Sequence, residues 1–286
     1  MRFTKMTGAG NDFIVLDAND TMSLPRDALR SLCDRRYGIG ADGLMLVRRA
    51  ESSRAATPED ASAPAFSVEF FNADGSGGML CGNGARCALV YAAAKGLIAY
   101  GQTSAFSFAG RSYRGCARDK GYARFELDPR YGTRLESGLR FCGHEASGRY
   151  FDLGSLHFVL DISDLSEAGG QALGAKLELL DVQALGSALR HHERFSPQGV
   201  NVNFCALEEG LLRVRTFERG VEAETLACGT GSTASALSYA LRGLVQPPVR
   251  VRVRSGDELL IDFDDAEHPT RLSLSGPAKA VFKGEI

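Results

Sequence analysis

The chain has 286 residues, 44% of them hydrophobic, which is enough to bury a large core in two domains of ordinary size. Its 33 Lys and Arg balance 35 Asp and Glu, and the formal net charge of −2 excludes a strongly basic nucleic-acid-binding protein. The sequence has no apolar run of about 18 residues and begins without a signal-peptide pattern, so we expect a cytoplasmic protein with neither nucleic-acid nor membrane partners.

The first half of the chain predicts strands around one apolar helix. A glycine turn leads into an apolar strand at residues 10–17, and the Pro- and Ser-rich residues 50–65 predict a surface loop. Residues 85–95 are rich in Ala and Leu and predict a helix. Strands at residues 113–117 and 122–127 flank an Asp-Lys-Gly turn, which indicates a hairpin.

The second half predicts similar elements in the same order. A glycine turn leads into a strand at residues 154–161, which ends in Val-Leu-Asp as residues 10–17 do. A helix is predicted at residues 232–242. Residues 249–254 alternate with period 2, and a Ser-Gly-Asp turn joins them to a strand at residues 258–263.

A glycine-rich motif also occurs twice. Residues 81–84 read Cys-Gly-Asn-Gly, and residues 228–231, 147 positions later, read Cys-Gly-Thr-Gly. Each motif precedes a predicted helix, and each helix is followed by a glycine suited to the C′ position, Gly96 or Gly243, 15 residues after the cysteine. We therefore predict an α+β fold of two pseudo-symmetric domains, with a boundary near residue 128.

Seven cysteines cannot all pair within one chain, so we expect most of them to be thiols in a reducing compartment. Cys81 and Cys228 differ from the others because each precedes a predicted helix. A thiol there faces unpaired N–H groups and the positive end of the helix dipole, which stabilise the thiolate. The neighbouring glycines let backbone amides approach a carboxylate closely. The remaining five are expected to be small, mostly buried thiols: Cys33, Cys87, Cys116, Cys142 and Cys205.

Two such thiols on opposite sides of one small ligand suit the inversion of a stereocentre. One thiolate removes a proton from a tetrahedral carbon, while the other thiol delivers a proton to the opposite face. The two helix N-termini stabilise the carbanion, so neither a cofactor nor a metal is required. The same two thiols also suit a reversible redox disulfide, and the cysteine motifs alone do not separate the two functions.

Three segments carry a resemblance to a known family. Residues 5–13 read Lys-Met-Thr-Gly-Ala-Gly-Asn-Asp-Phe, residues 72–87 run from Asn-Ala-Asp-Gly-Ser through the first cysteine motif, and residues 218–231 run from Glu-Arg-Gly through the second. In this order the chain resembles diaminopimelate epimerase along its length. The resemblance implies that each domain wraps a mixed, barrel-like sheet around a central helix, with the ligand in the cleft between the domains.

The resemblance also implies the domain limits and the activity. The domains are residues 1–128, with a returning C-terminal strand at about 275–286, and residues 129–274. The implied enzyme is a homodimeric isomerase that converts LL-2,6-diaminoheptanedioate to the meso form, without a cofactor, in lysine and peptidoglycan-precursor biosynthesis. Cys81 and Cys228 match its two acid/base cysteines.

Other residues match positions that bind the substrate or tune the thiols. His157 and Glu218 match positions that tune the pKa values of the two cysteines. The substrate-binding set implied by the resemblance is Asn11, Asn72, Gly82, Asn83, Asn201, Glu218, Arg219, Gly229 and Thr230. Because the substrate has two amino-acid ends, we expect the Arg219 guanidinium to bind the distal carboxylate.

The chain departs from the family pattern at three places. Ser155 and Leu156 replace Asn-Pro before His157, so a serine hydroxyl stands where an asparagine ligand is expected. Gly43 stands where some members have a glutamine ligand, and the stretch 218–225 is one residue longer than the commonest form. These differences leave an altered affinity or a related substrate open.

Two alternative functions also remain open from the sequence. A proline or hydroxyproline racemase-like enzyme would share the fold, although a one-ended cyclic imino acid does not need Arg219 and the asparagines. A thiol redox protein would instead use Cys81 and Cys228 as a reversible disulfide.

Overall fold

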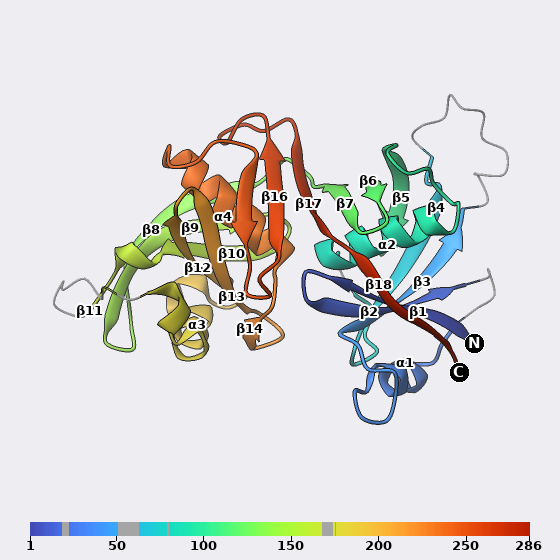
Figure 1. Ribbon diagram of the computed structural model, residues 1–286. Coiled ribbons are helices and arrows are strands. Elements are labelled where there is room, and N and C mark those ends of the chain that lie inside the picture. Colours follow the sequence, from blue (N-terminus) through green and yellow to red (C-terminus); the bar gives the residue numbers. More distant parts are fainter. Residues whose placement is uncertain (19–22, 51–62, 79, 168–173, 175) are drawn as a thin grey trace. The chain divides into compact units, whose positions relative to one another are not determined.

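The computed structural model describes residues 1–18, 23–50, 63–78, 80–167, 174 and 176–286, and most of the predicted loop at 50–65 lies outside them. The chain divides into two compact units, Met1–Glu126 with Ser275–Ile286, and Leu127–Leu274 (Figure 1). They are called unit 1 and unit 2 below. Within the described ranges, no helix is long and apolar enough to cross a bilayer.

Unit 1 is a mixed sheet curled around a helix. Its strands pair in the order β18-β1-β2-β3-β4-β5-β6-β7. The β2–β3 and β4–β5 pairs are parallel, and the other neighbours in this order are antiparallel. The helices α1 (Arg26–Cys33) and α2 (Gly82–Ala94) connect the two parallel pairs, which need a crossover. The strands are β1 (Arg2–Gly8), β2 (Asn11–Asp17), β3 (Gly43–Arg49), β4 (Phe66–Asn72), β5 (Ser104–Phe108), β6 (Arg111–Asp119), β7 (Tyr122–Glu126) and β18 (Lys279–Glu285).

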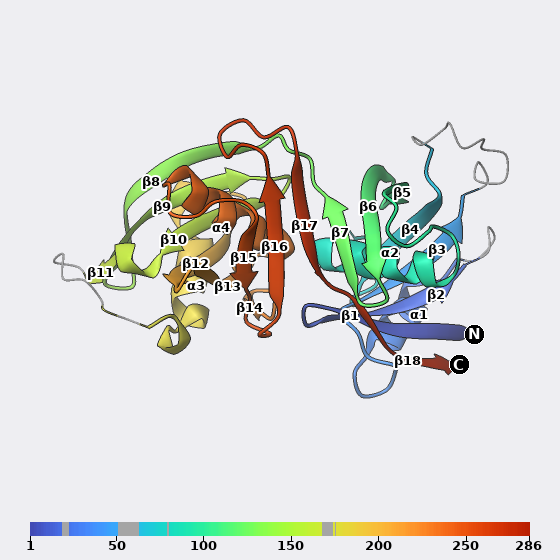
Figure 2. The ribbon, with the colours of Figure 1, turned by 45° about the horizontal axis from the view of Figure 1, so that its top comes forward.

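Helix α2 is the centre of unit 1. Every residue from Asn83 to Ala93 is buried, and strands β1 to β3 lie on one side of the helix with β6 and β7 on the other (Figure 2). Its residues are mainly Ala, Gly and other apolar types, and a helix that is apolar on all sides is stable only when it is enclosed. The sheet and the helix therefore bury each other.

Unit 2 repeats this arrangement. Its main strands pair in the order β8-β9-β10-β12-β13-β15-β16, while β11 (Leu165–Glu167) pairs with β9 and β14 (Ala223–Thr225) with β13. In the described part of this unit, the helices are α3 (Val182–Arg190) and α4 (Gly229–Leu241), and short 3₁₀ turns lie at Ile162–Asp164, Leu177–Leu179 and Glu193–Phe195. The remaining strands are β8 (Gly132–Phe141), β9 (His144–Asp152), β10 (Leu156–Asp161), β12 (Asn201–Glu208), β13 (Leu211–Glu218), β15 (Val249–Arg252), β16 (Glu258–Phe263) and β17 (Leu272–Pro277), in which the chain returns to unit 1.

The strand pairings confirm the predicted duplication. From β1 to β6 the successive pairs are antiparallel, parallel, antiparallel, parallel and antiparallel. The same series runs through β9, β10, β12, β13, β15 and β16. Helix α4 is buried along most of its length, as α2 is. The predicted α+β class, with a mixed sheet around a central helix in each half, is confirmed.

Both central helices end in the same way. Gly96 has a φ of 67° and its N–H donates to the Ala93 carbonyl, while the Leu97 N–H donates to the Ala92 carbonyl. Gly243, with a φ of 71°, ends α4 with the equivalent two bonds. These pairs of bonds define a Schellman motif, which places glycine at C′ because a left-handed backbone disfavours a Cβ atom. The predicted C′ glycines are confirmed.

We predict that Gly96→Ala lowers the free energy of unfolding by about 1 kcal/mol, because alanine disfavours the positive φ although a Cβ there meets no neighbouring atom. Gly77→Ala is the matched control, since Gly77 also has open space for a Cβ but no positive φ. Urea denaturation measures both variants. Equal stabilities of the two would contradict a conformational cost at Gly96.

Candidate active site

Each predicted catalytic cysteine is the N-cap residue of a central helix. Cys81 has φ −114° and ψ 110°, and its Sγ accepts from the Gly84 N–H at 3.4 Å. Cys228 has φ −116° and ψ 113°, and its Sγ accepts from the Gly231 N–H, also at 3.4 Å. The predicted position of both thiols at a helix N-terminus is confirmed. The N–H donor and the helix dipole both favour a thiolate.

The other five cysteines are free thiols, four buried and one, Cys142, exposed. Burial raises the pKa of Cys33 to about 11, and it raises the pKa values of Cys87 and Cys205 to about 12. A thiolate is therefore disfavoured at these three positions near neutral pH. The expectation that the five are mostly buried is confirmed.

In unit 1, the residues beside Cys81 form a chain of amide contacts. The Asn83 Nδ2 donates to the Asn11 Oδ1 at 2.5 Å, and the Arg86 Nη2 donates to the Asn83 Oδ1 at 2.8 Å. Asn83 and Arg86 are buried, with exposures of 3% and 0%. The Asn11 Nδ2 donates to the Asp42 Oδ2 at 3.0 Å. The structure therefore brings Asn11 and Asn83 together and fixes the orientation of both amides.

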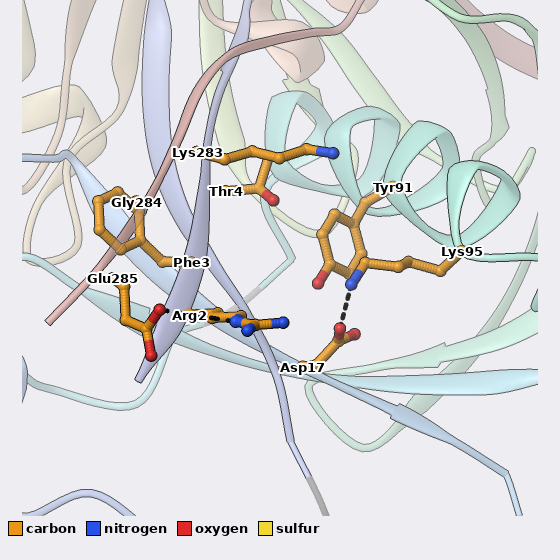
Figure 3. Close-up of a pocket in the computed structure, with 9 residues that line it drawn as sticks. All are labelled: Arg2, Phe3, Thr4, Asp17, Tyr91, Lys95, Lys283, Gly284 and Glu285. Carbon is orange, nitrogen blue, oxygen red and sulfur yellow. Dashed lines mark hydrogen bonds and ion pairs between the residues drawn. The ribbon is translucent and has the colours of Figure 1, made fainter.

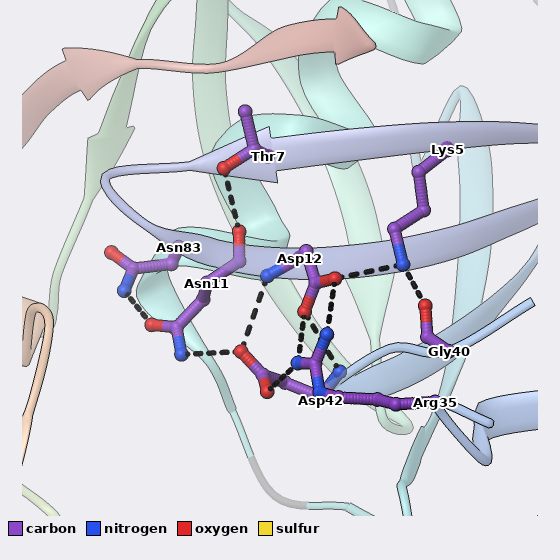
Figure 4. A network of polar contacts seen from close by, with 8 residues as sticks. All are labelled: Lys5, Thr7, Asn11, Asp12, Arg35, Gly40, Asp42 and Asn83. Carbon is purple, nitrogen blue, oxygen red and sulfur yellow. Dashed lines mark hydrogen bonds and ion pairs between the residues drawn. The ribbon is translucent and has the colours of Figure 1, made fainter. Parts of the chain in front are cut away.

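An ionic cluster holds the hairpin that carries Asn11 (Figure 4). The Lys5 Nζ lies 2.7 Å from the Asp12 carboxylate, and an Arg35 Nη2 lies 2.7 Å from both Asp12 and Asp42. Although burial raises the pKa of Asp12, hydrogen bonds from Arg35 and Lys5 lower it to about 2. Lys5 is itself only 6% exposed. The Asp12 carboxylate therefore stays ionised near neutral pH, and its pairs with Lys5 and Arg35 anchor β2 at the residue after Asn11.

Two other predicted positions of unit 1 have local roles. The exposed Asn72 lies in a tight turn, where its Nδ2 donates to the Ser76 Oγ at 3.0 Å. Gly43 pairs with Asn72 across β3 and β4, and a Cβ on Gly43 would lie 2.7 Å from the Phe71 carbonyl oxygen and 2.8 Å from the Phe70 ring. A glutamine side chain does not fit at position 43 unless these groups move.

A cavity of about 560 Å³ lies elsewhere in unit 1, between the ends of β1, β18 and α2 (Figure 3). Its charged residues include Lys95 paired with Asp17, and Arg2 paired with Glu285 at 3.6 Å. The described residues that line it include none of the predicted site residues. It is therefore separate from the candidate site.

In unit 2, four side chains form a compact polar cluster at the start of α4. The His157 Nε2 lies 2.8 Å from the Ser155 Oγ and 3.0 Å from the Thr230 Oγ1, and the two hydroxyl oxygens lie 3.1 Å apart. The Thr230 Oγ1 lies 3.6 Å from the Cys228 Sγ. His157 is fully buried, and this burial, together with the positive charge of Arg219, lowers its pKa to about 3. The imidazole is therefore neutral near pH 7.

The remaining predicted residues of unit 2 shape the adjoining turn. The Asn201 Oδ1 accepts from the Arg219 backbone N–H at 2.9 Å, and its Nδ2 donates to the Leu156 carbonyl at 2.8 Å. The Thr225 hydroxyl donates to the Glu218 carboxylate. Arg219 is half-buried, and its guanidinium lies against backbone carbonyls of residues 198–199. The structure thus brings Asn201 and Arg219 together through the backbone.

Sequence reasoning missed the residues that support these groups. Asp42 and Arg35 hold the Asn11 side chain and its hairpin, while Asn203 and Thr216 lie behind His157. The sequence carries a weak signal for Asn203, because it lies two positions after Asn201 and so on the same face of a strand. Arg86, the charged residue of a helix whose other residues are mainly apolar, carries a similar signal.

Comparison with known proteins identifies the family. The family model "Diaminopimelate epimerase" matches residues 3–110 and 154–281. A diaminopimelate epimerase of Aquifex aeolicus is 37% identical over 298 aligned positions, covering 100% of this chain and 98% of the relative. The chain belongs to the diaminopimelate epimerase family. It is accordingly an isomerase. A second diaminopimelate epimerase, from Chlorobaculum tepidum, is 36% identical and covers 98% of this chain and 99% of its own length.

Solved structures with low sequence identity share the fold. A Bacillus anthracis phenazine biosynthesis protein of the PhzF family has a TM-score of 0.66 at 10% identity, covering 100% of this chain and 98% of its own. A probable proline racemase from Agrobacterium radiobacter K84 has a TM-score of 0.65 at 14% identity, covering 100% and 92%. At such identities the likeness concerns the fold alone.

We predict that His157 makes the protein less stable as the pH falls. Its pKa is about 3 in the folded chain and about 6.5 in an unfolded one, so below pH 6.5 the unfolded state binds the extra proton. Between pH 8 and pH 5, this preferential protonation of the unfolded state lowers the free energy of unfolding by about 2 kcal/mol. Urea denaturation of the wild type and of His157→Gln at both pH values measures it. An equal loss in the two proteins would show that His157 titrates normally.

Proposed function

We propose that this protein interconverts LL- and meso-2,6-diaminoheptanedioate, without pyridoxal phosphate or a metal, in lysine and peptidoglycan-precursor synthesis. The observation that carries the proposal is that Cys81 and Cys228 cap two equivalent helices with the same backbone geometry. Membership of the diaminopimelate epimerase family supports the choice of substrate.

In the proposed reaction, one cysteine acts as base and the other as acid. The thiolate takes the proton from the substrate α-carbon, the C–H electron pair becomes a carbanion delocalised into the carboxylate, and the second thiol protonates the opposite face. The cycle ends with the thiol and the thiolate exchanged. Because Gly82 and Gly229 begin their helices, their N–H groups lack intrahelical partners and suit the developing negative charge on the carboxylate.

We propose that the polar residues divide the substrate between them. The fixed amides of Asn11 and Asn83, together with Asn72, suit its ammonium and carboxylate groups. Asn201, Glu218 and Thr230 complete the set, and Arg219 supplies a cation for the distal carboxylate. Ser155 lies in hydrogen-bond contact with Thr230, so its hydroxyl takes part in this set through Thr230. The homodimer is a prediction from the family, and the cytoplasmic location is a prediction from the sequence.

The two alternatives have less support. Relatives at 33% to 37% identity over nearly their full lengths carry the name diaminopimelate epimerase, whereas the proline racemase likeness stands at 14% identity. A redox protein has no use for the fixed Asn11 and Asn83 amides or for Arg219. A substrate panel that contains diaminopimelate, proline and hydroxyproline separates the first two functions.

We predict that Cys81→Ala and Cys228→Ala each lower epimerisation by about 10³-fold or more, because each removes an acid/base group. The measurement is conversion of LL- to meso-diaminopimelate, followed together with exchange of the α-proton in deuterated water, with protein freed of pyridoxal phosphate and metals. Cys142→Ala, which removes an exposed thiol, is the control and retains activity. Full epimerisation by both active-site variants would rule out the two-thiol mechanism.

We predict that Asp42→Ala raises KM about tenfold and changes kcat less, because Asn11 loses the carboxylate that orients its amide. Steady-state kinetics with LL-diaminopimelate measure both constants. Asp119→Ala removes an exposed aspartate at the end of β6 and serves as the control. An unchanged KM for Asp42→Ala would mean that Asn11 does not need this support.

A further inference from the structure

A buried polar stack lies behind Cys228. His157 on β10, Asn203 on β12 and Thr216 on β13 are exposed by 0%, 0% and 3%, and Asn203 and Thr216 are directly paired across their strands. The Thr216 hydroxyl donates to the Asn203 Oδ1 at 3.0 Å, and the Asn203 Nδ2 lies 3.3 Å from the His157 Nδ1. The three polar side chains thus form a continuous series of contacts from Thr216 in the core of the sheet to the His157 ring, which lies beside Thr230.

The equivalent positions in unit 1 are apolar. The duplicated strands align His157 with Phe13, and the matching strand pairs align Asn203 and Thr216 with Met45 and Phe70. Phe13, Met45 and Phe70 pack in the core of unit 1. A fold that tolerates apolar residues at all three positions does not need the polar stack for its architecture. The polar stack therefore belongs to the Cys228 half in particular.

The contacts of Asn203 determine which way its amide faces. Its Nδ2 lies 3.1 Å from the Phe158 carbonyl oxygen, which can only accept, so this atom is the NH₂ group. Its Oδ1 accepts from Thr216. The second hydrogen of the Asn203 NH₂ group therefore points to the His157 Nδ1, which must be the unprotonated nitrogen of the neutral ring.

The ring proton is then left on the other nitrogen. The His157 Nε2–H faces the hydroxyl oxygens of Ser155 and Thr230, which accept from it. When the Thr230 oxygen accepts, its own hydrogen is available for the Cys228 Sγ at 3.6 Å. We propose that Asn203 is a positioning residue that holds neutral His157 as the Nε2–H tautomer and so turns the Thr230 hydroxyl hydrogen toward Cys228. Only the role of Cys228 as an acid/base group rests on the proposed function.

The packing of Gly231 independently supports the positioning role of Asn203. A Cβ on Gly231 would lie 2.2 Å from the Asn203 Oδ1, so the Asn203 amide packs directly against the first turn of α4. The Gly231 N–H and the Thr230 hydroxyl then both donate to the Cys228 sulfur. Two donors stabilise its thiolate more than one. Among the charged groups, Arg219 acts on His157, because its positive charge lowers the pKa of the ring.

The tautomer is measured directly by ¹⁵N NMR of the full-length protein labelled on histidine, with His157→Gln to assign the signal. At pH 7 we expect a protonated Nε2 and an unprotonated Nδ1. Asn203→Asp is nearly isosteric, and because a carboxylate only accepts, we expect the Nδ1 of His157 to become protonated. A wild-type ring with its proton on Nδ1, or an unchanged tautomer in folded Asn203→Asp, overturns the proposal. If that variant does not fold, the wild-type spectrum decides.

The hydrogen bond from the Thr230 hydroxyl to the Cys228 sulfur is tested separately. The rate at which iodoacetamide alkylates Cys228 at pH 7, followed by peptide mass spectrometry, reports the thiolate fraction. Thr230→Val is expected to slow it about tenfold, since a hydrogen bond to a charged acceptor is lost. Thr233→Val removes another buried hydroxyl of α4, one bonded to the Gly229 carbonyl, and should leave the rate unchanged. An unchanged alkylation rate in Thr230→Val overturns the proposal. If only the proposed function is wrong, the protein shows no exchange of the substrate α-proton, while the His157 tautomer and the slower alkylation of Thr230→Val are both still observed.

Discussion

The enclosure of one apolar helix by a curled sheet is the constraint on which the rest of each unit depends. Because α2 and α4 are buried along most of their lengths, their first N–H groups are held in fixed places and cannot be satisfied freely by water. Cys81 and Cys228 satisfy one of these groups in each helix. A thiol held in this way is both a structural cap and a group whose ionised form the helix stabilises.

The two halves keep this geometry but surround it differently. In unit 1, charged groups of the Lys5–Asp12–Arg35–Asp42 cluster fix Asn11 from the outside of the hairpin, and the positions that match the polar stack of unit 2 are apolar. In unit 2, the support comes from within the core, through His157 and Asn203. The two units therefore keep the same backbone geometry at each cysteine, while the side chains behind the two cysteines differ.

Much of this arrangement could be predicted from the sequence. The repeated Cys-Gly-x-Gly motifs, the Ala-rich helices and the C′ glycines Gly96 and Gly243 are local patterns, and local patterns determine where helices begin and end. The supporting residues could not be predicted, because Asp42, Asn203 and Thr216 act on residues that are distant along the chain. Only strand register decides which of these side chains meet.

By itself, the sequence determined the α+β class, the duplication and the two thiols at helix N-termini, since each depends on residue types at short spacings. The family resemblance supplied the candidate substrate. The tertiary structure alone decided that His157 is neutral, that its Nδ1 lies 3.3 Å from the Asn203 Nδ2, and that Asn11 is held between Asp42 and Asn83. These properties depend on burial and on contacts between separate strands, and burial changes the charge of a group only after the chain has folded around it.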